Sequence, residues 1–427
     1  MDRVVQFCVI ISKKSHTLTR RTHEARHQES DEKNGDVLST LSSFNDMRTL
    51  SRVAPAPFTA SKRTNASSTS ARRWSSSSTV TRAGSEDETL RSFDPDMVGY
   101  IAPELLVSNL TVCDIEDDDD EGCVGKGAFS ECFLGTLRAD DGADVDVVVK
   151  KYLAVPGRDV ASFYDDEWDA CRVLRTCPGV APFLGAAGVK QYLVWENVGL
   201  VTLENALEGG DDAFQVARDA MPSALSSAKT DAECFIAIAK ALTASIAAIH
   251  GNDIIHRDVK PSNVLLSDAR GVVLCDLGAA ADVETGRGMD GEAIFDPIYG
   301  APEQFEIVQT GGGVLGGLFG RKKADDKSSI ELRATGETPT FLFDAFSLGI
   351  TLLRLGVPSL RSATAIAQAR KDIDACGGDI VRWRNEICVA GVNDWSLVDG
   401  TGAWETITRL THPLPSARLS VGEAEFK

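Results

Sequence analysis

Residues 254–266 have the sequence IIHRDVKPSNVLL, which carries more information about the architecture than any other segment. The two isoleucines predict a short buried strand, and polar residues are then crowded into the next eight positions. Asp258 can accept a proton from a hydroxyl group, Lys260 can neutralise charge on a phosphoryl group, and Asn263 can hold a metal ion. This loop is therefore a candidate site of phosphoryl chemistry, with Asp258 and Lys260 as its catalytic residues.

A second acidic residue follows at a short distance along the chain. Eighteen residues after Asp258, the apolar run Val272–Leu274 predicts a strand that delivers Asp276 to a turn ending at Gly278. A carboxylate at such a turn suits Mg²⁺, which takes oxygen ligands and bridges phosphate groups. Asn263 and Asp276 are therefore the predicted metal ligands.

A glycine-rich turn, VGKGAFS at residues 124–130, lies upstream between residues typical of strands. Glycines let the backbone approach phosphate oxygens closely, and the N–H groups of such a turn can bind them. An ordinary glycine-containing hairpin explains the same pattern. Taken alone, this motif leaves both interpretations open.

A lysine ends the next apolar strand. The run Val147–Val149 leads directly into Lys150, whose amine must reach solvent or an anion such as a nucleotide phosphate. A following segment with helical periodicity contains Glu167, whose carboxylate can orient the ammonium group. Its neighbours Asp165 and Asp166 remain alternatives for that role.

The order of elements predicts two lobes with a cleft between them. Strands are predicted at Glu131–Leu137, Val145–Tyr152 and Tyr192–Trp195, around a helix at Ser162–Leu174. After Leu203 the pattern becomes mostly helical. The fold class predicted from these elements is α+β.

The motifs, taken in order, resemble the signature set of protein kinases. Asp-Leu-Gly stands where Asp-Phe-Gly is usual, and Ala301-Pro302-Glu303 resembles the end of the activation segment. Asp344 resembles the aspartate that anchors the central helix of the large lobe, and Arg418 resembles the arginine that pairs with Glu303. The resemblance covers about residues 120–427.

This resemblance implies a bilobal kinase fold, with a small β-rich N-lobe that holds one helix and a larger α-helical C-lobe. It implies ATP and Mg²⁺ as cofactors, and the pair Lys260-Pro261 favours Ser/Thr over tyrosine acceptors. The implied nucleotide-binding residues are Val124, Gly125, Lys126, Gly127, Ser130, Cys132, Lys150, Glu167 and Glu196.

Further segments are similar to the thylakoid state-transition kinases, a family that phosphorylates light-harvesting antenna proteins in plants and algae. Trp195 precedes Glu196 at the start of the interlobe hinge, as in that family, and is expected to lie against the adenine pocket. The similar segments are DLGAAADV (276–283), FDPIYGAPEQF (295–305), VPSLRS (357–362) and LVDGTGAWE (397–405).

Three positions depart from the general kinase pattern. Ser130 replaces the third glycine of the loop, and Cys132 replaces the usual valine. Asp296 stands where most Ser/Thr kinases have a threonine that bridges the catalytic aspartate and lysine, and it is expected to lie near Lys260. A catalytically weak pseudokinase scaffold is the alternative hypothesis, although it requires the loss of a catalytic group.

The net charge of −19 is distributed unevenly over the 427 residues. Residues 1–83 carry 14 Lys+Arg against 7 Asp+Glu, whereas the remainder carries 30 against 56. An acidic body of this kind disfavours nucleic acid and favours basic partners, such as Ser/Thr-containing basic tails of thylakoid proteins. Ten cysteines without a C-x-x-C pair indicate reduced thiols rather than a zinc site or disulfide framework.

Residues 47–83 contain seven Lys+Arg and no Asp or Glu, a composition that predicts a chloroplast transit peptide. A disordered basic tail is the other interpretation. The resulting location is the chloroplast, in the stroma or on the stromal face of the thylakoid. The predicted divisions are a disordered leader (1–46), the transit peptide (47–83), an acidic linker (84–118) and the kinase domain (119–427), which comprises an N-lobe (119–196), a C-lobe (197–427) and a Gly-rich insertion (about 306–338) with a flexible loop at 311–320.

No run of 18 or more apolar residues predicts a membrane span. The nearest candidate, Phe235–Ile249, contains Lys240 and has the apolar spacing of an amphipathic core helix. Some antenna kinases carry a membrane span and paired cysteines ahead of the kinase domain, and residues 84–120 contain neither. We therefore expect a soluble or peripheral relative without redox control through lumenal cysteines.

The activation segment offers few positions for phosphorylation. Arg257, before the catalytic aspartate, hints at such control, but Thr285 and Tyr299 are the only hydroxyl side chains between Leu277 and Ala301. Thr285 is either a phosphorylation site or an ordinary loop residue.

Overall fold

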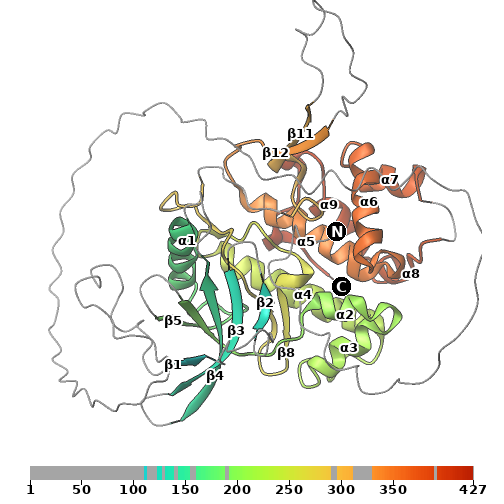
Figure 1. Cartoon of the computed structure of the whole chain (residues 1–427). Helices are drawn as coiled ribbons and strands as arrows, with labels where there is room; N and C mark the ends of the chain where they lie inside the picture. Colours follow the sequence, from blue (N-terminus) through green and yellow to red (C-terminus); the bar gives the residue numbers. More distant parts are fainter. Residues whose placement is uncertain are drawn as a thin grey trace, which may run out of the picture.

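The protein consists of a sheet-rich lobe and a larger, mainly helical lobe, as Figure 1 shows. This arrangement, seen in a computed structural model, confirms the predicted α+β bilobal architecture. The structure describes residues 110–112, 123–126, 130–138, 143–153, 160–187, 192–289, 296–310, 329–388 and 392–426.

The secondary structure matches the predicted elements closely. The strands are β1 (Leu110–Val112), β2 (Cys123–Lys126), β3 (Ser130–Arg138), β4 (Asp144–Tyr152), β5 (Phe183–Ala187), β6 (Tyr192–Glu196), β7 (Ile254–Ile255), β8 (Val264–Ser267), β9 (Gly271–Leu274), β10 (Ala281–Asp282), β11 (Phe305–Thr310) and β12 (Ser329–Ala334). The α-helices are α1 (Val160–Val173), α2 (Leu203–Glu208), α3 (Ala213–Ala220), α4 (Asp231–His250), α5 (Phe341–Gly356), α6 (Ala363–Ala375), α7 (Ile380–Glu386), α8 (Ser396–Gly400) and α9 (Ala403–Leu410).

The small lobe is built on a six-stranded sheet in the order β1-β3-β4-β6-β5, with β2 paired to β3. Strand β4 contributes side chains to both faces of the sheet, because successive side chains of a strand point to opposite faces. Val147 and Val149 are fully buried in the sheet core, whereas Val148 and Lys150 share the other face. Cys132 on β3 lies directly opposite Lys150. The alternation therefore brings Lys150, Val148 and Cys132 to one face.

Strand β1 adds a strand to the sheet ahead of the predicted start of the kinase domain. Leu110 pairs with Leu137, and Val112 pairs with Gly135, so β1 belongs to the sheet. These residues fall within the predicted acidic linker 84–118, ahead of the expected domain start at residue 119. A strand of three residues is too short to produce a recognisable alternation in the sequence.

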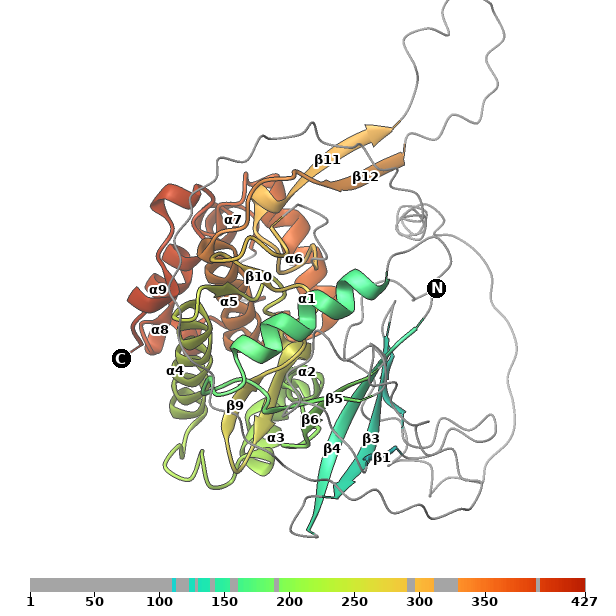
Figure 2. The same ribbon diagram turned by 90° about the vertical axis from the view of Figure 1, so that its left-hand side faces the viewer.

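Helix α1 packs between the sheet and the large lobe, as Figure 2 shows. Tyr164, Trp168 and Cys171, at helical spacing, are buried, and the Trp168 ring meets the Phe183 ring of β5 edge-on at 5.4 Å. Aromatic pairs in this arrangement contribute beyond the area that they bury. Glu167 is fully buried on the same helix, and its position relative to the sheet is thereby fixed.

Helices α4 and α5 form the centre of the large lobe. Helix α4 starts at a capping box, in which Thr230 accepts from the Glu233 N–H and the Glu233 carboxylate accepts from the Thr230 N–H. Every residue of α5 from Phe343 to its end is buried. At Gly349 a Cβ atom would lie 2.4 Å from the side chain of Thr411, so a glycine is needed for this close packing.

Within the described residues, α4 is the one helix long and apolar enough to cross a membrane by length and composition. Half of its apolar window is buried inside the protein, and Phe235, Leu242 and Ile246 belong to the main core. The interpretation of 235–249 as a core helix is therefore confirmed.

Strands β11 and β12 form an antiparallel hairpin that projects from the large lobe in Figure 2. These strands lie near the two ends of the predicted insertion 306–338, where no strand was predicted. The glycine-rich loop 311–320 lies outside the described residues, as do the predicted leader 1–46, the predicted transit peptide 47–83 and most of the predicted linker.

Candidate active site

Lys150 is held between two carboxylates in the cleft. Its Nζ atom lies 2.7 Å from Oε2 of Glu167 and 2.8 Å from Oδ1 of Asp276. The three residues come from β4, α1 and the segment after β9, and all three side chains are buried. Glu167, rather than Asp165 or Asp166, is therefore the partner of Lys150.

Burial and charge act in opposite directions on this group. Burial lowers the pKa of Lys150, but the carboxylates of Asp276 and Glu167 raise it further, to well above the ordinary value. Burial opposes ionisation of Asp276, yet Lys150 lowers the pKa of that carboxyl. Burial raises the pKa of Glu167, although Lys150 opposes the shift, and Tyr152 also donates its hydroxyl to Glu167. The lysine is thus a cation throughout the physiological range.

The loop that contains Asp258 is anchored from beneath by Asp344 of α5. The Asp344 carboxylate accepts from the backbone N–H of His256 at 2.8 Å and of Arg257 at 2.7 Å, and lies 2.9 Å from His250 Nε2. Arg257 adopts a φ of +66°, which is unusual for a residue with a side chain. The two N–H bonds hold the backbone in this strained conformation.

Asp258, Lys260 and Asn263 converge as the sequence predicted. Oδ2 of Asp258 lies 2.8 Å from Lys260 Nζ and accepts from Asn263 Nδ2 at 2.9 Å. Among the described residues, no hydrogen bond to Oδ1 of Asp258 is found. Because Lys260 and Asn263 both contact Oδ2, Oδ1 of Asp258 is the oxygen that can accept a proton.

The predicted metal ligands carry buried oxygens that suit a cation. Oδ1 of Asn263 and Oδ2 of Asp276 are buried and have no hydrogen-bond partner in the described part of the chain. Leaving such acceptors unsatisfied costs about 1–3 kcal/mol each, so a bound cation would stabilise this arrangement. One amide and one carboxylate oxygen are the donor types that Mg²⁺ takes. These residues therefore fit a hard divalent cation.

Asp296 lies near Lys260, as expected. Its Oδ2 atom is 3.9 Å from Lys260 Nζ, and its side chain is buried. The ammonium group consequently lies within ion-pair distance of two carboxylates, those of Asp258 and Asp296.

A pocket between the lobes gathers most of the predicted nucleotide-binding residues. Lys126 is exposed and lies 3.9 Å from Glu131, Ser130 is buried in β3 outside the pocket lining, and Gly127 lies outside the described residues. The predicted residues that line the pocket are Val124, Gly125, Cys132, Lys150, Glu167, Glu196 and Asp276, together with Trp195.

Sequence reasoning missed several apolar residues of this pocket, among them Val148, Ala181, Leu265 and Cys275. Val148 could have been found, since it stands two residues before Lys150 on the same face of β4. Ala181 could not, because it lies in an irregular segment without periodicity.

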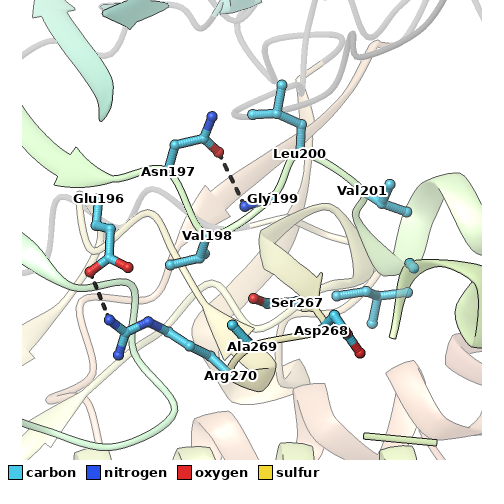
Figure 3. A pocket seen from close by; sticks show the side chains of 12 residues that line it. Glu196, Asn197, Val198, Gly199, Leu200, Val201, Ser267, Asp268, Ala269 and Arg270 are labelled. Carbon is cyan, nitrogen blue, oxygen red and sulfur yellow. Dashed lines mark hydrogen bonds and ion pairs between the residues drawn. The ribbon is translucent and has the colours of Figure 1, made fainter. Parts of the chain in front are cut away.

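A second pocket, shown in Figure 3, is lined by residues 196–201 of the hinge and by residues 266–270 of the β8–β9 turn. There the Glu196 carboxylate accepts from Arg270 Nη2 at 2.7 Å, and Asn197 Oδ1 accepts from the Gly199 N–H at 3.1 Å. The side chain of Glu196 is therefore tied to the β8–β9 turn. Its backbone remains the part of this residue available to the nucleotide pocket.

The end of the activation segment is tied to the C-terminal part of the chain by a largely buried ion pair. Glu303 and Arg418 form two contacts, of 2.6 and 3.0 Å, in the bidentate geometry that Arg favours with carboxylates. The pairing predicted from the resemblance is confirmed.

Residues 119–313 match the protein kinase domain family. The described part of the chain has the protein kinase fold. Its similarity extends to two proteins of Arabidopsis thaliana: the chloroplastic Ser/Thr protein kinase STN8, 26% identical over 69% of this chain, and the chloroplastic Ser/Thr protein kinase STN7, 27% identical over 70%. The kinase matches span 66% and 55% of these relatives' own lengths.

The kinase fold also agrees with a solved structure, that of a Stt7 homolog from Micromonas algae soaked with ATP. The TM-score is 0.56 and the identity 22%, over 81% of this chain and 96% of that chain. The predicted fold and the predicted resemblance to the thylakoid Ser/Thr kinases are thereby confirmed.

Proposed function

We propose that the protein is an active Ser/Thr protein kinase that transfers the γ-phosphoryl group of ATP to hydroxyl groups of proteins. The observation that carries this proposal is the convergence of Lys150, Glu167, Asp258, Lys260 and Asp276 at one cleft. Beside them, two buried oxygens, of Asn263 and Asp276, have no hydrogen-bond partner among the described residues. The similarity to STN8 and STN7 supports a Ser/Thr acceptor.

In this proposal, Lys150 binds the α- and β-phosphates of ATP and Glu167 orients it. The ammonium group already has carboxylate partners on two sides, so a bound phosphate would meet a fixed cation. Apolar residues of both lobes, among them Val148, Trp195 and Leu265, line the same pocket and suit a planar base.

Asn263 and Asp276 would hold Mg²⁺, consistent with their buried oxygens. When bound, the metal ion supplies positive charge that neutralises phosphate oxygens and orients them. Both ligands are held in place by other residues of the chain. The Asn263 amide donates to Asp258, and the Asp276 carboxylate is paired with Lys150.

Asp258 acts as the base toward the acceptor hydroxyl. Its Oδ2 atom is occupied by Lys260 and Asn263, so Oδ1 is the oxygen that takes the proton. Lys260 stabilises charge on the transferred group. Little covalent chemistry is required of the protein, so positioning and preorganised charge supply the acceleration.

A scaffold without catalysis would require the loss of one of these groups. Lys150, Asp258, Asn263 and Asp276 are all present with the contacts that catalysis requires. No feature of the described residues therefore favours the pseudokinase alternative.

We further propose a chloroplast location and basic, Thr-containing tails of thylakoid proteins as substrates. The names of STN8 and STN7 identify both as chloroplastic kinases, and residues 47–83 have the composition of a transit peptide. The strongly acidic remainder of the chain favours basic substrates. A stromal position, free or peripheral at the membrane, is the corresponding hypothesis.

Asp258→Asn tests the activity directly. Transfer from labelled ATP to a basic Thr-containing peptide should disappear, whereas nucleotide binding, measured by calorimetry, should be retained. Asp394→Asn is a matched control, because this residue accepts a backbone N–H at an exposed turn away from the cleft. Unchanged turnover in Asp258→Asn would contradict the proposal.

A further inference from the structure

Tyr152, the last residue of β4, is a second donor to the carboxylate that pairs with Lys150. Its hydroxyl donates to Oε2 of Glu167, the same oxygen that lies 2.7 Å from Lys150 Nζ. Tyr152 stands two positions after Lys150, so the alternation of the strand places both side chains on one face of the sheet. A lysine and a tyrosine of one strand therefore meet at a single oxygen atom of α1.

The Glu167 carboxylate has few other contacts that could fix its direction. The side chain is fully buried, and its Oε1 atom has no hydrogen-bond partner in the described part of the chain. Lys150 is in addition shared with Asp276, whose Oδ1 atom lies 2.8 Å from Nζ. Without the tyrosine, the direction of the Glu167 carboxylate would depend on one ammonium group at the end of a flexible side chain.

The Tyr152 ring is itself fixed by packing. It meets the ring of Tyr164, from α1, edge-on at 5.5 Å, and Lys150 Nζ lies 5.5 Å from its centroid. Contacts of these two kinds have preferred geometries, so they favour one orientation of the ring. A tyrosine has only two side-chain torsions, and its hydroxyl is therefore held in place once the ring is packed. Tyr152 consequently gives Glu167 a rigid donor whose position does not depend on the lysine side chain.

We propose that Tyr152 is a positioning residue for phosphoryl transfer, whose hydroxyl keeps the Glu167 carboxylate directed at Lys150. This inference rests on the proposed kinase function. The phosphates of ATP would compete with the carboxylates for the Lys150 ammonium, and a carboxylate held by Lys150 alone would follow any movement of the lysine. The tyrosine holds Glu167 by a hydrogen bond to a charged group, which is stronger than one between neutral groups. Lys150 therefore keeps one fixed counter-ion while it binds a phosphate.

Tyr152→Phe removes the hydroxyl and retains the packed ring. We expect kcat/KM for ATP to fall about ten-fold, because a hydrogen bond to a buried charged group is lost. Tyr164→Phe is the matched control, since it removes a neighbouring phenol hydroxyl that is also buried but has no hydrogen-bond partner among the described residues. This control should change kcat/KM less than about two-fold.

A double-mutant cycle tests whether Tyr152 acts through Glu167. In a Glu167→Gln background the charged partner of the hydroxyl is gone, so adding Tyr152→Phe should change kcat/KM less than about two-fold. A loss that came only from poorer packing of the small lobe would be the same in both backgrounds. Calorimetric titration with ATP follows the same cycle without turnover. Tyr152→Phe should weaken ATP binding about three- to ten-fold, and only where Glu167 is present.

Unchanged kcat/KM together with unchanged ATP affinity in Tyr152→Phe would overturn the inference. An equal loss with and without Glu167 would also overturn it and leave Tyr152 as a packing residue. Absence of transfer by an unsubstituted protein that still binds ATP would instead overturn the proposed function, and the calorimetric cycle would then decide whether Tyr152 acts through Glu167. A protein that bound no ATP would overturn both.

Discussion

Lys150 on β4 and Glu167 on α1, 17 positions apart in the sequence, form a direct ion pair with Nζ 2.7 Å from Oε2. Neither side chain has access to solvent that could replace the contact. The position of α1 against the sheet therefore decides whether Lys150 is oriented toward a phosphate. Phosphate binding by Lys150 thus depends on how the small lobe is packed.

Glu167→Gln should reduce kcat/KM about ten- to a hundred-fold, because the amide is neutral and no longer orients the Lys150 ammonium by charge. Steady-state phosphorylation of a basic Thr-containing peptide measures this loss. Asp165→Asn and Asp166→Asn are the matched controls on the same helix, and neither should change kcat/KM more than about two-fold. A larger loss of kcat/KM in either control would show that Asp165 or Asp166, and not Glu167, orients Lys150.

Asp276→Asn should raise the Mg²⁺ concentration needed for half-maximal transfer by about ten-fold or more, because the amide removes a charged ligand. Its partner Lys150 would also lose one of its two carboxylates. Titration with Mn²⁺ followed by electron paramagnetic resonance gives a readout that does not depend on turnover. Equal Mn²⁺ affinity in the variant and the unsubstituted protein would contradict the assignment of this carboxylate as a metal ligand.

The chemistry of the site could be predicted from sequence because its residues are fixed by local motifs. Asp258, Lys260 and Asn263 lie within one loop, and Asp276 ends the adjacent strand, so their order alone indicates a shared site. The partner of Lys150 required a choice among three neighbouring acids, since helical spacing places a residue on a face only once the packing of α1 is known.

Other features depend on contacts between distant segments and leave no local trace. Strand β1 gains its conformation by pairing with β3, and the hairpin of β11 and β12 joins segments separated by a glycine-rich insertion. The ion pair of Glu196 with Arg270 joins the hinge to the turn between β8 and β9, which lie far from it in sequence. These features are therefore determined by contacts between distant segments, and the periodicity of the local sequence does not predict them.

Arg418→Ala should destabilise the large lobe by about 3 kcal/mol, because it leaves the Glu303 carboxylate without its partner and removes donors to the carbonyls of His412 and Leu342. Urea unfolding measures the change. Arg382→Ala removes an ion pair with Glu386 in which both side chains are 54% exposed, and should have no measurable effect. Equal destabilisation by both substitutions would contradict a specific role for the Glu303–Arg418 pair.

Acidification should unfold the protein partly through Asp344. Burial opposes ionisation of this carboxyl, but the hydrogen bond and charge of His250, the charge of His256 and the His256 N–H together lower its pKa. A carboxyl whose pKa is lower in the folded state stabilises the fold at pH values above its ordinary pKa of 3.8. This contribution is lost as the pH falls through the folded-state pKa. The free energy of unfolding should therefore rise with pH in the window below about pH 4.

Asp344→Asn should flatten that slope and lower the stability at pH 7 by about 2 kcal/mol, because the amide nitrogen cannot accept from the backbone N–H of His256 or Arg257. Urea unfolding between pH 3 and pH 7 measures both effects. The slope of Asp394→Asn provides the comparison, since the pKa of Asp394 is lowered at an exposed turn rather than in the core. A slope in Asp344→Asn equal to that of the unsubstituted protein would show that other carboxyls govern the acid transition. In that case the Asp344 contacts would hold the catalytic loop in place without contributing to the pH dependence of the free energy of unfolding.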